Sequence, residues 1–165
     1  MPETIYYLEM LTPPPAPAGP LPEGFSVRAV DPPQPEVNRQ FYIEVGGPWQ
    51  WTDRLVWSES DWKSHVYKPV VKTFVGRVGT QDAGFFEFEQ QDGGNVEIVY
   101  FGLLPDFIGK GLGGALLDSA IEAAWDLPGT KRVWLHTCSD DHQRALANYR
   151  SRGFTLFDPE RSSSS

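Results

Sequence analysis

The spacing of hydrophobic and polar positions along the chain predicts alternating groups of short strands and helices. Apolar side chains alternate with polar ones at Phe25, Val27 and Ala29, which is typical of a strand. Between 111 and 125 the apolar positions step by three and four residues, which indicates an amphipathic helix. The predicted strands are 4–11, 25–29, 70–78, 83–90, 95–104, 131–138 and 154–157, and the predicted helices are 34–45, 54–66, 111–125 and 142–152.

This order predicts a mixed α/β or α+β fold in which helices pack against a sheet. Glycine- and aspartate-containing segments at 81–84 and 91–94 separate the three central strands, which favours antiparallel hairpins. The proline-rich segment 13–20 is expected to be a stiff spacer, too short to separate two domains. We therefore expect a single domain over 1–165, with a disordered tail at 160–165.

The composition and charge narrow the class of protein. The chain has 165 residues, of which 40% are hydrophobic, so it can bury one sizeable core. It lacks an apolar run of the ~18 residues that a membrane span needs, and its start lacks the features of a signal peptide. One cysteine cannot form an internal disulfide, so a cytoplasmic location is expected. A net charge of −8 argues against nucleic-acid partners and favours cationic small molecules such as amines.

The segment 98–117 carries the clearest candidate chemistry. A hydrophobic strand leads into a glycine-dense turn that opens an amphipathic helix. The unpaired N–H groups and the dipole at such a helix start favour a phosphate or pyrophosphate. The glycines also fit the dinucleotide pattern G-x-G-x-x-G, but the strand 131–138 lacks the acidic residue which that fold requires. A nicotinamide-dependent oxidoreductase and a purely structural glycine turn remain as alternatives.

At this point the sequence resembles the GNAT family, the GCN5-related N-acetyltransferases. The family signature is Arg or Gln, two residues, Gly, one residue and then Gly or Ala, and its frame falls on 108–113 (IGKGLG). The approach at 104–107 (LPDF) and the late segment 145–154 (ALANYRSRGF) also look like the family. The resemblance covers about residues 4–158. It implies a mixed, mostly antiparallel sheet with helices on both faces, and transfer of an acetyl group from acetyl-CoA to a primary amine.

The resemblance also implies how acetyl-CoA is held. The glycine turn takes the pyrophosphate, Lys110 can add a charge, and two strands splay near Gly102 to admit the pantetheine arm. Ile108 departs from the family's Arg or Gln and removes one phosphate contact, while His142 stands where many members carry Asn. The expected cofactor-binding residues are Phe101, Leu103, Ile108, Gly109, Lys110, Gly111, Leu112, Gly113, Gly114 and His142.

Acyl transfer to an amine requires a base, because an amine of pKa ~10.4 is protonated at neutral pH. Glu97 is the candidate base, since it is the sole charge between Val96 and Leu104. Strand alternation predicts that it shares a face with Val99, Phe101 and Leu103. The alternative is that the strand begins at 98 and leaves Glu97 in solvent.

Two further catalytic roles come from the resemblance. The Leu103 amide is expected to face the thioester carbonyl, where an oxyanion develops. Tyr149 is expected to give a proton to the departing CoA sulfur. The alternative for Tyr149 is a core position, because it forms an apolar stripe with Ala145 and Leu146.

The acceptor is a small-molecule or peptide amine that the sequence leaves unidentified. By resemblance the connection between the first two helices lines the acceptor side, so Trp49, Trp51 and Asp53 are the expected substrate-binding residues. Trp57 and Trp62 are expected to pack between helices. Dimers are common among proteins that resemble this one, so a homodimer is compatible with the resemblance.

His136, Cys138 and His142 lie close together in the sequence and suggest two other kinds of site. A zinc site lacks its second pair of cysteines, so no metal is expected. A Cys–His nucleophile is less favoured than an inert buried cysteine. A module that binds acyl-CoA as a sensor or scaffold, without turnover, is the main functional alternative to an enzyme.

Overall fold

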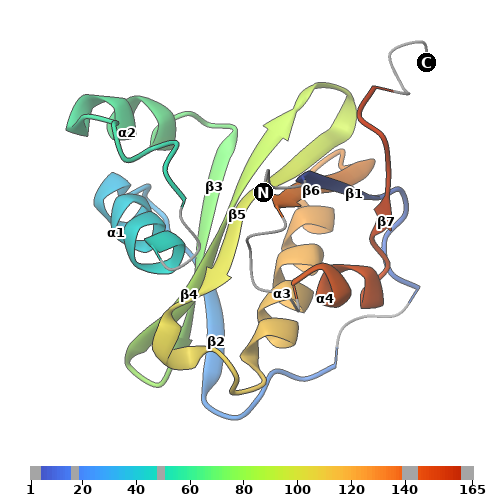
Figure 1. The fold of residues 1–165 in the computed structure, drawn as a ribbon, viewed down its shortest axis with the longest axis horizontal. Helices are drawn as coiled ribbons and strands as arrows, with labels where there is room; N and C mark the ends of the chain where they lie inside the picture. The colour runs from blue at the N-terminus through green and yellow to red at the C-terminus, as the bar shows by residue number, and fades with distance from the viewer. Residues whose placement is uncertain (1–4, 16–18, 48–50, 139–144, 161–165) are drawn as a thin grey trace.

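The computed structural model describes residues 5–15, 19–47, 51–138 and 145–160. Its strands form one sheet of seven strands in the order β2-β3-β4-β5-β6-β1-β7 (Figure 1). The strands are β1 (Ile5–Met10), β2 (Phe25–Ala29), β3 (Val71–Val78), β4 (Gln81–Gln91), β5 (Asn95–Leu103), β6 (Arg132–Cys138) and β7 (Thr155–Leu156). The α-helices are α1 (Pro35–Gly46), α2 (Glu59–Val66), α3 (Leu112–Asp126) and α4 (Ala145–Ser151).

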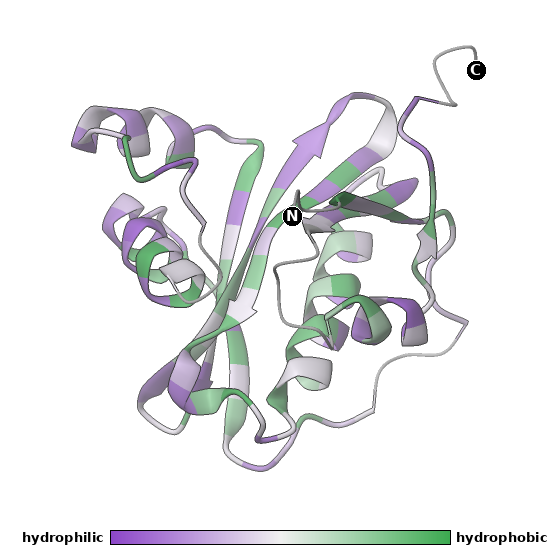
Figure 2. Cartoon of the chain, in the orientation of Figure 1, coloured by the Kyte–Doolittle hydropathy of each residue, from purple (hydrophilic) through white to green (hydrophobic). Residues whose placement is uncertain are grey.

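The sheet is mixed and mostly antiparallel, which confirms the predicted fold class. Among the described residues, the strand pairs are antiparallel except β5 with β6, which is parallel. The main core lies between the sheet and α3 with α4, and two smaller aromatic clusters lie under α1 and α2. Alternation along β4 supplies both faces, because Phe86 and Phe88 join the main core while Phe85 joins an α1 cluster. Figure 2 shows the corresponding contrast between the hydrophilic α2 and the more hydrophobic α3.

The second helix begins five residues later than the periodicity predicts. The Ser58 side chain accepts a hydrogen bond from the Asp61 N–H, and the Asp61 carboxylate accepts one from the Ser58 N–H. This capping box fixes the start of α2 at Glu59. The preceding residues form turns instead, so Arg54 lies in the connection between α1 and α2.

The predicted turn at 81–84 is wrong, because those residues belong to β4. The chain reverses at Gly79, whose φ of +58° suits a glycine. Gly84 serves packing instead, since a Cβ there would lie 2.6 Å from the Gly102 carbonyl oxygen. The turn predicted at 91–94 contains a short 3₁₀ helix, Asp92–Gly94.

The first strand of the chain lies inside the sheet. β1 pairs antiparallel with β6 on one side and with β7 on the other. Leu8 and Met10 are buried in the main core, and the buried carboxylate of Glu9 accepts a hydrogen bond from Arg132 Nε at 2.9 Å. Within the described residues, β7 therefore joins the sheet through its pairing with β1.

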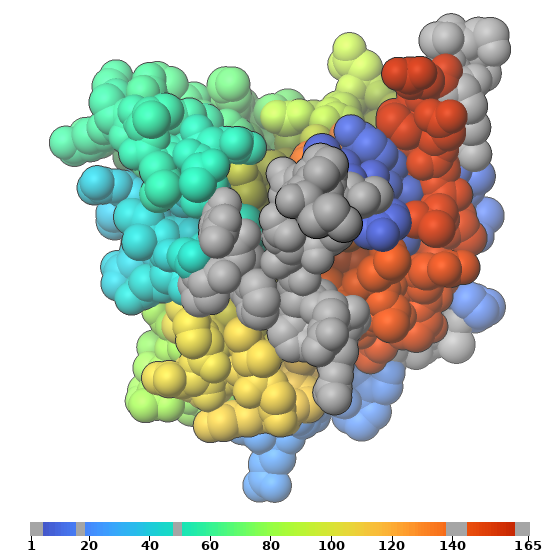
Figure 3. Space-filling view, viewed as in Figure 1, coloured from blue at the N-terminus to red at the C-terminus, as the bar shows by residue number. Residues whose placement is uncertain are grey.

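The described part of the chain contains no helix that is both long and apolar enough to cross a membrane. In the space-filling view, α2 with the turns before it lies on one side of the visible face, and β1 with the α4–β7 segment lies on the other (Figure 3).

Candidate active site

A cavity opens where the two parallel strands part. β5 and β6 pair only at Asn95–Glu97 with Arg132–Trp134, and β5 then continues to Leu103 paired with β4 but not with β6 (Figure 1). Beside the edge of β5 that β6 leaves open lies a cavity of about 680 Å³. Its walls come from α1, the end of β5, the turn before α3, and α4, and they are mostly apolar.

The turn before α3 presents backbone N–H groups toward open space. Gly109 and Gly111 have φ values of +84° and +80°, which favour glycine. The residue at the N-cap position of α3 is Gly111, which has no side chain that could accept from the first N–H groups of the helix. A Cβ added at either glycine would meet no atom within 4 Å. The backbone and the free space around it therefore fit a phosphate group.

The end of β5 directs a backbone donor toward the cavity. The Leu104 N–H donates to the Ala83 carbonyl oxygen of β4 at 2.7 Å. Successive N–H groups of a strand point in opposite directions. The Leu103 N–H therefore points away from β4, toward the gap where β6 has left the ladder, and Leu103 lines the cavity.

Most of the residues expected to bind the cofactor do surround this cavity. The expected residues that line it are Phe101, Leu103, Ile108, Gly109, Gly111, Gly113 and Gly114. Tyr149 also lines it, with only 7% of its surface exposed, and its ring lies edge-on to Phe101 at 6.1 Å. Leu112 is buried in the main core, and His142 lies outside the described residues.

Lys110 does not line this cavity. It lines a second hollow together with Glu44, Asp82 and Asp106. Its Nζ lies 5.4 Å from the centre of the Phe107 ring. The positive charge that the sequence placed in the glycine turn therefore belongs to a different surface.

Glu97 does not share a face with Phe101 and Leu103, so that expectation is wrong. The ladder between β4 and β5 shifts its register midway, and Val99 is the extra residue in β5. Such a bulge reverses the alternation of side chains. Phe101 and Leu103 pack toward α3, whereas Glu97 lies on the opposite face with Tyr100.

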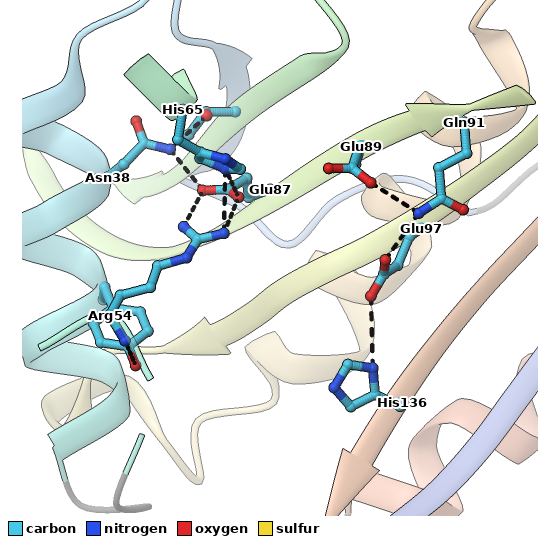
Figure 4. A network of polar contacts seen from close by, with 10 residues as sticks. Asn38, Arg54, His65, Glu87, Glu89, Gln91, Glu97 and His136 are labelled. Carbon is cyan, nitrogen blue, oxygen red and sulfur yellow. Dashed lines mark hydrogen bonds and ion pairs between the residues drawn. The ribbon is translucent and has the colours of Figure 1, made fainter. Parts of the chain in front are cut away.

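Glu97 is nevertheless part of the strand and mostly buried. β5 begins at Asn95, and the Glu97 side chain is 12% exposed, so the alternative of a solvent position before the strand is wrong. Gln91 Nε2 donates to Glu97 at 3.0 Å and to Glu89 at 2.9 Å. His136 Nδ1 lies 3.5 Å from the other Glu97 oxygen (Figure 4).

A buried ionic network lies next to Glu97 on the same face (Figure 4). The Arg54 guanidinium donates to both oxygens of Glu87, at 3.1 and 2.9 Å, and His65 Nε2 lies 2.9 Å from Glu87 Oε2. Asn38 Nδ2 adds a hydrogen bond at 2.9 Å. Burial alone would raise the pKa of Glu87, but the hydrogen bonds from His65 and Arg54 lower it to about 2.

This network was not found from the sequence. Its members come from α1, the turn before α2, α2 itself and β4, so only the folded chain brings them together. The available signal was Glu87 itself, a lone charge between Phe86 and Phe88. The network holds the connection between α1 and α2 against the sheet, and Arg54 also lies over the Trp57 and Tyr100 rings, at 4.6 Å from each.

The residues expected to bind the acceptor have different surroundings. Trp51 lines the cavity and packs on Tyr100, with ring centres 4.8 Å apart. Asp53 is exposed on the same connection, and Trp49 lies outside the described residues. Trp62 is buried against Trp57, which agrees with a packing role.

Comparison with known proteins gives a family match. A model of the acetyltransferase (GNAT) family matches residues 35–154, which include the whole glycine turn and α4. Comparison with curated protein sequences gives no match.

Solved structures with the same fold include two GCN5-related N-acetyltransferases. The protein from Sphaerobacter thermophilus has a TM-score of 0.69 at 20% identity, over 94% of this chain and 48% of that chain. The protein from Kribbella flavida has a TM-score of 0.65 at 19% identity, over 93% of this chain and 56% of that chain. This chain thus spans about half the length of each.

A third structure matches over most of both chains. It is a spermidine N-acetyltransferase from Vibrio cholerae in complex with CoA and spermine, with a TM-score of 0.67 at 17% identity. The match covers 83% of this chain and 84% of that chain. At these identities the likeness concerns the fold.

Proposed function

Because the chain belongs to the GNAT family of acetyltransferases, whose members use acyl-CoA, we propose that it transfers an acetyl group from acetyl-CoA to a primary amine. The observation that carries the proposal is the cavity that joins the uncapped start of α3 to the end of β5, where β6 no longer pairs with it. One end offers backbone donors to a pyrophosphate, and the other offers a backbone donor to a carbonyl oxygen. Acetyl-CoA supplies the activated acetyl group.

The chain's residues take the following roles in this proposal. The N–H groups between Gly109 and Gly114 hold the pyrophosphate, and Phe101 flanks the pantetheine arm. The Leu103 N–H stabilises the negative charge that develops on the thioester oxygen. Tyr149 donates a proton to the departing sulfur, from a position where burial excludes most water.

Glu97 is the proposed base, and its position defines the side from which the amine arrives. It lies on the face that carries α1 and α2, where Trp51 reaches the cavity from the connection between those helices. Glu97 does not itself line the cavity, so the proton reaches it through water. A net charge of −8 suits a cationic acceptor, and the neighbour from Vibrio cholerae was solved with such an amine, spermine.

The absence of Glu97 from the residues that line the cavity also supports a second candidate function. A protein that binds acyl-CoA without turnover needs the glycine turn and the split strands but no base. This candidate shares every feature of the cavity with the enzyme. The two therefore differ only in the release of CoA when an amine is added.

The test measures CoA binding by calorimetry and CoA thiol release from acetyl-CoA with a panel of polyamines, amino-acid amides and peptides. Gly111→Glu should abolish binding, because it places a carboxylate and a strained backbone at the phosphate site. Gly129→Glu is the matched control, because Gly129 has a φ of +79° and equally open surroundings outside the cavity.

We expect amine-dependent CoA release from the wild type and from Gly129→Glu, and a rate reduced about tenfold or more in Tyr149→Phe. Binding of CoA with no release for any amine would favour the non-catalytic module. An absence of CoA binding by the wild type would contradict both candidates.

A further inference from the structure

We infer that Arg152 is the side chain that binds the pyrophosphate of acyl-CoA, a role that neither residue 108 nor Lys110 can fill. The inference rests on the proposed function, because it assigns a residue to the same cavity. A pyrophosphate carries two negative charges, and a cradle of backbone N–H groups supplies only partial positive charge. A cation beside the turn would therefore add to the binding.

The cavity has neither the signature side chain of the family at position 108 nor the Lys110 charge that was expected from the sequence. Position 108 is isoleucine and lines the wall as an apolar side chain. Lys110 turns to the second hollow, where Glu44, Asp82 and Asp106 surround it. The turn itself therefore provides no charged side chain to this cavity.

Arg152 provides one from the opposite wall. It directly follows α4, and among the described residues that line the cavity it is the one with a charged side chain. Its guanidinium lies over the first turn of α3, so close that a Cβ at Gly114 would collide with Nη2. Gly114 thus lets the guanidinium lie beside the N–H groups of the phosphate cradle.

The guanidinium is held in place by its other nitrogens. Nε donates to Asp118 Oδ1 at 3.1 Å, and Nη1 donates to Ser151 Oγ at 3.1 Å. Within the described residues the structure gives Nη2 no acceptor, and Nη2 is the nitrogen that lies over Gly114. The side chain is 30% exposed, so a ligand in the cavity can reach it.

The arrangement of the Arg152 guanidinium leaves part of it available to bind an anion. Asp118 fixes one edge of the planar guanidinium and leaves the other edge for oxygen atoms of a ligand. Asp118 and Gly114 both belong to α3. The guanidinium is therefore held at a fixed position relative to the N–H groups at the start of that helix. The positive end of the helix and the guanidinium then act on the same phosphate groups.

The test compares CoA affinity by calorimetry in the wild type, Arg152→Gln and Arg150→Gln. Arg150→Gln is the matched control, because it removes the same charge from the same helix end at an exposed position outside the cavity. We expect Arg152→Gln to weaken CoA binding about ten- to hundredfold, the range for a hydrogen bond to a charged group. Arg150→Gln should change it less than about twofold.

A third variant separates ligand binding from a structural role. Asp118→Asn removes the negative charge of the ion pair but keeps an amide oxygen that can accept the hydrogen bond from Arg152 Nε. We expect it to bind CoA at least as tightly as the wild type, because a negative charge near the phosphates is gone. Equal losses in Asp118→Asn and Arg152→Gln would mean that the pair only shapes the cavity, and would overturn the inference.

Dephospho-CoA, which lacks the ribose 3′-phosphate, identifies the group that Arg152 meets. The loss in Arg152→Gln should be the same for CoA and dephospho-CoA if the arginine binds the pyrophosphate. A loss that disappears with dephospho-CoA would overturn the assignment in favour of the 3′-phosphate. If the wild type and Arg152→Gln bind CoA with the same affinity, the inference is refuted and the proposed function is unaffected. If the wild type does not bind CoA, the proposed function itself is refuted.

Discussion

Glu87 shows how burial and partners together decide what a carboxylate can do. The side chain is almost completely buried, and isolation there would favour its neutral form. Arg54 and His65 instead hold its pKa at about 2, so it is ionised throughout the neutral range. A carboxylate of that kind does not accept protons at neutral pH. Its role is to hold Arg54, and with it the connection that carries Trp51.

The same pKa predicts how stability depends on acid. The pKa of Glu87 falls from 4.5 when unfolded to about 2 when folded, a difference worth ~3 kcal/mol. That contribution is complete above pH ~4.5 and is lost as the pH falls toward 2. Glu87→Gln should cost ~3 kcal/mol or more at pH 7, because it leaves the Arg54 charge buried without its partner.

Urea unfolding at pH 7 and pH 3 checks this prediction. The difference in unfolding free energy between wild type and Glu87→Gln should shrink at pH 3, where the unfolded glutamate is largely protonated. Asp82→Asn is the control, since it breaks an exposed ion pair with Arg77 and should cost less than ~1 kcal/mol. A difference between Glu87→Gln and wild type that stays constant over this pH range would contradict the prediction.

At the scale of elements, the contact between β5 and α1 sets how closely the cavity walls approach. A Cβ at Gly102 would lie 2.5 Å from Val45 Cγ1, and both residues line the cavity. Gly102→Ala should therefore destabilise the fold by ~1–3 kcal/mol through overpacking. Val45→Ala removes the opposing methyl groups, so the double variant should lose less stability than the sum of the single variants.

Thermal or urea unfolding of the four proteins in this double-mutant cycle measures the coupling. Gly47→Ala serves as the control, because no atom lies within 4 Å of an added Cβ there and its φ of −52° suits alanine. If the losses of unfolding free energy in the two single variants simply add up in the double variant, the contact with Val45 of α1 is not the reason why a glycine is needed at position 102.

The elements also show where sequence patterns succeed and fail. Periodicity placed α3 and the central strands well, and the glycine turn could be recognised because its chemistry is local to six neighbouring residues, 109–114. The start of α2 was missed because the Ser58 cap outweighs the apolar spacing before it. The face on which Glu97 lies was predicted wrongly because Val99 is a bulge residue. The bulge reverses the alternation of side chains between the part of β5 before it and the part after it.

The roles of Arg152 and Glu87 lie beyond such patterns for a different reason. Arg152 reaches its place only when α4 packs on α3, and Glu87 meets Arg54 only when the first connection folds onto β4. The spacing of these residues along the chain does not predict either of these side-chain contacts. A lone charge in an apolar strand is the signal that would justify a search for such a partner.

At the scale of the molecule, β1 completes the sheet from the opposite end of the chain. It supplies Leu8 and Met10 to the main core, whose burial is worth ~1.5–3 kcal/mol each. Removal of residues 1–12 should therefore cost a large fraction of a typical stability of ~5–15 kcal/mol. It should also release β7, which pairs with β1.

Circular dichroism of the truncated protein checks this prediction. We expect loss of the cooperative thermal transition, and its partial recovery when a synthetic peptide of residues 1–12 is added in excess. Removal of residues 162–165 is the control and should leave the transition unchanged. A truncated chain that melts cooperatively within a few degrees of the full chain would show that β1 is dispensable.

The place of β1 has a consequence for the order of events at the ribosome. Glu9 is made before its partner Arg132, which follows 123 residues later in the chain. A strand with an apolar face therefore stays unpaired until β6 is synthesised, and the sheet can close only after that. Closure of the sheet is therefore coupled to the synthesis of β6 and β7, and translation products that stop before β6 should expose β1 and be prone to aggregation.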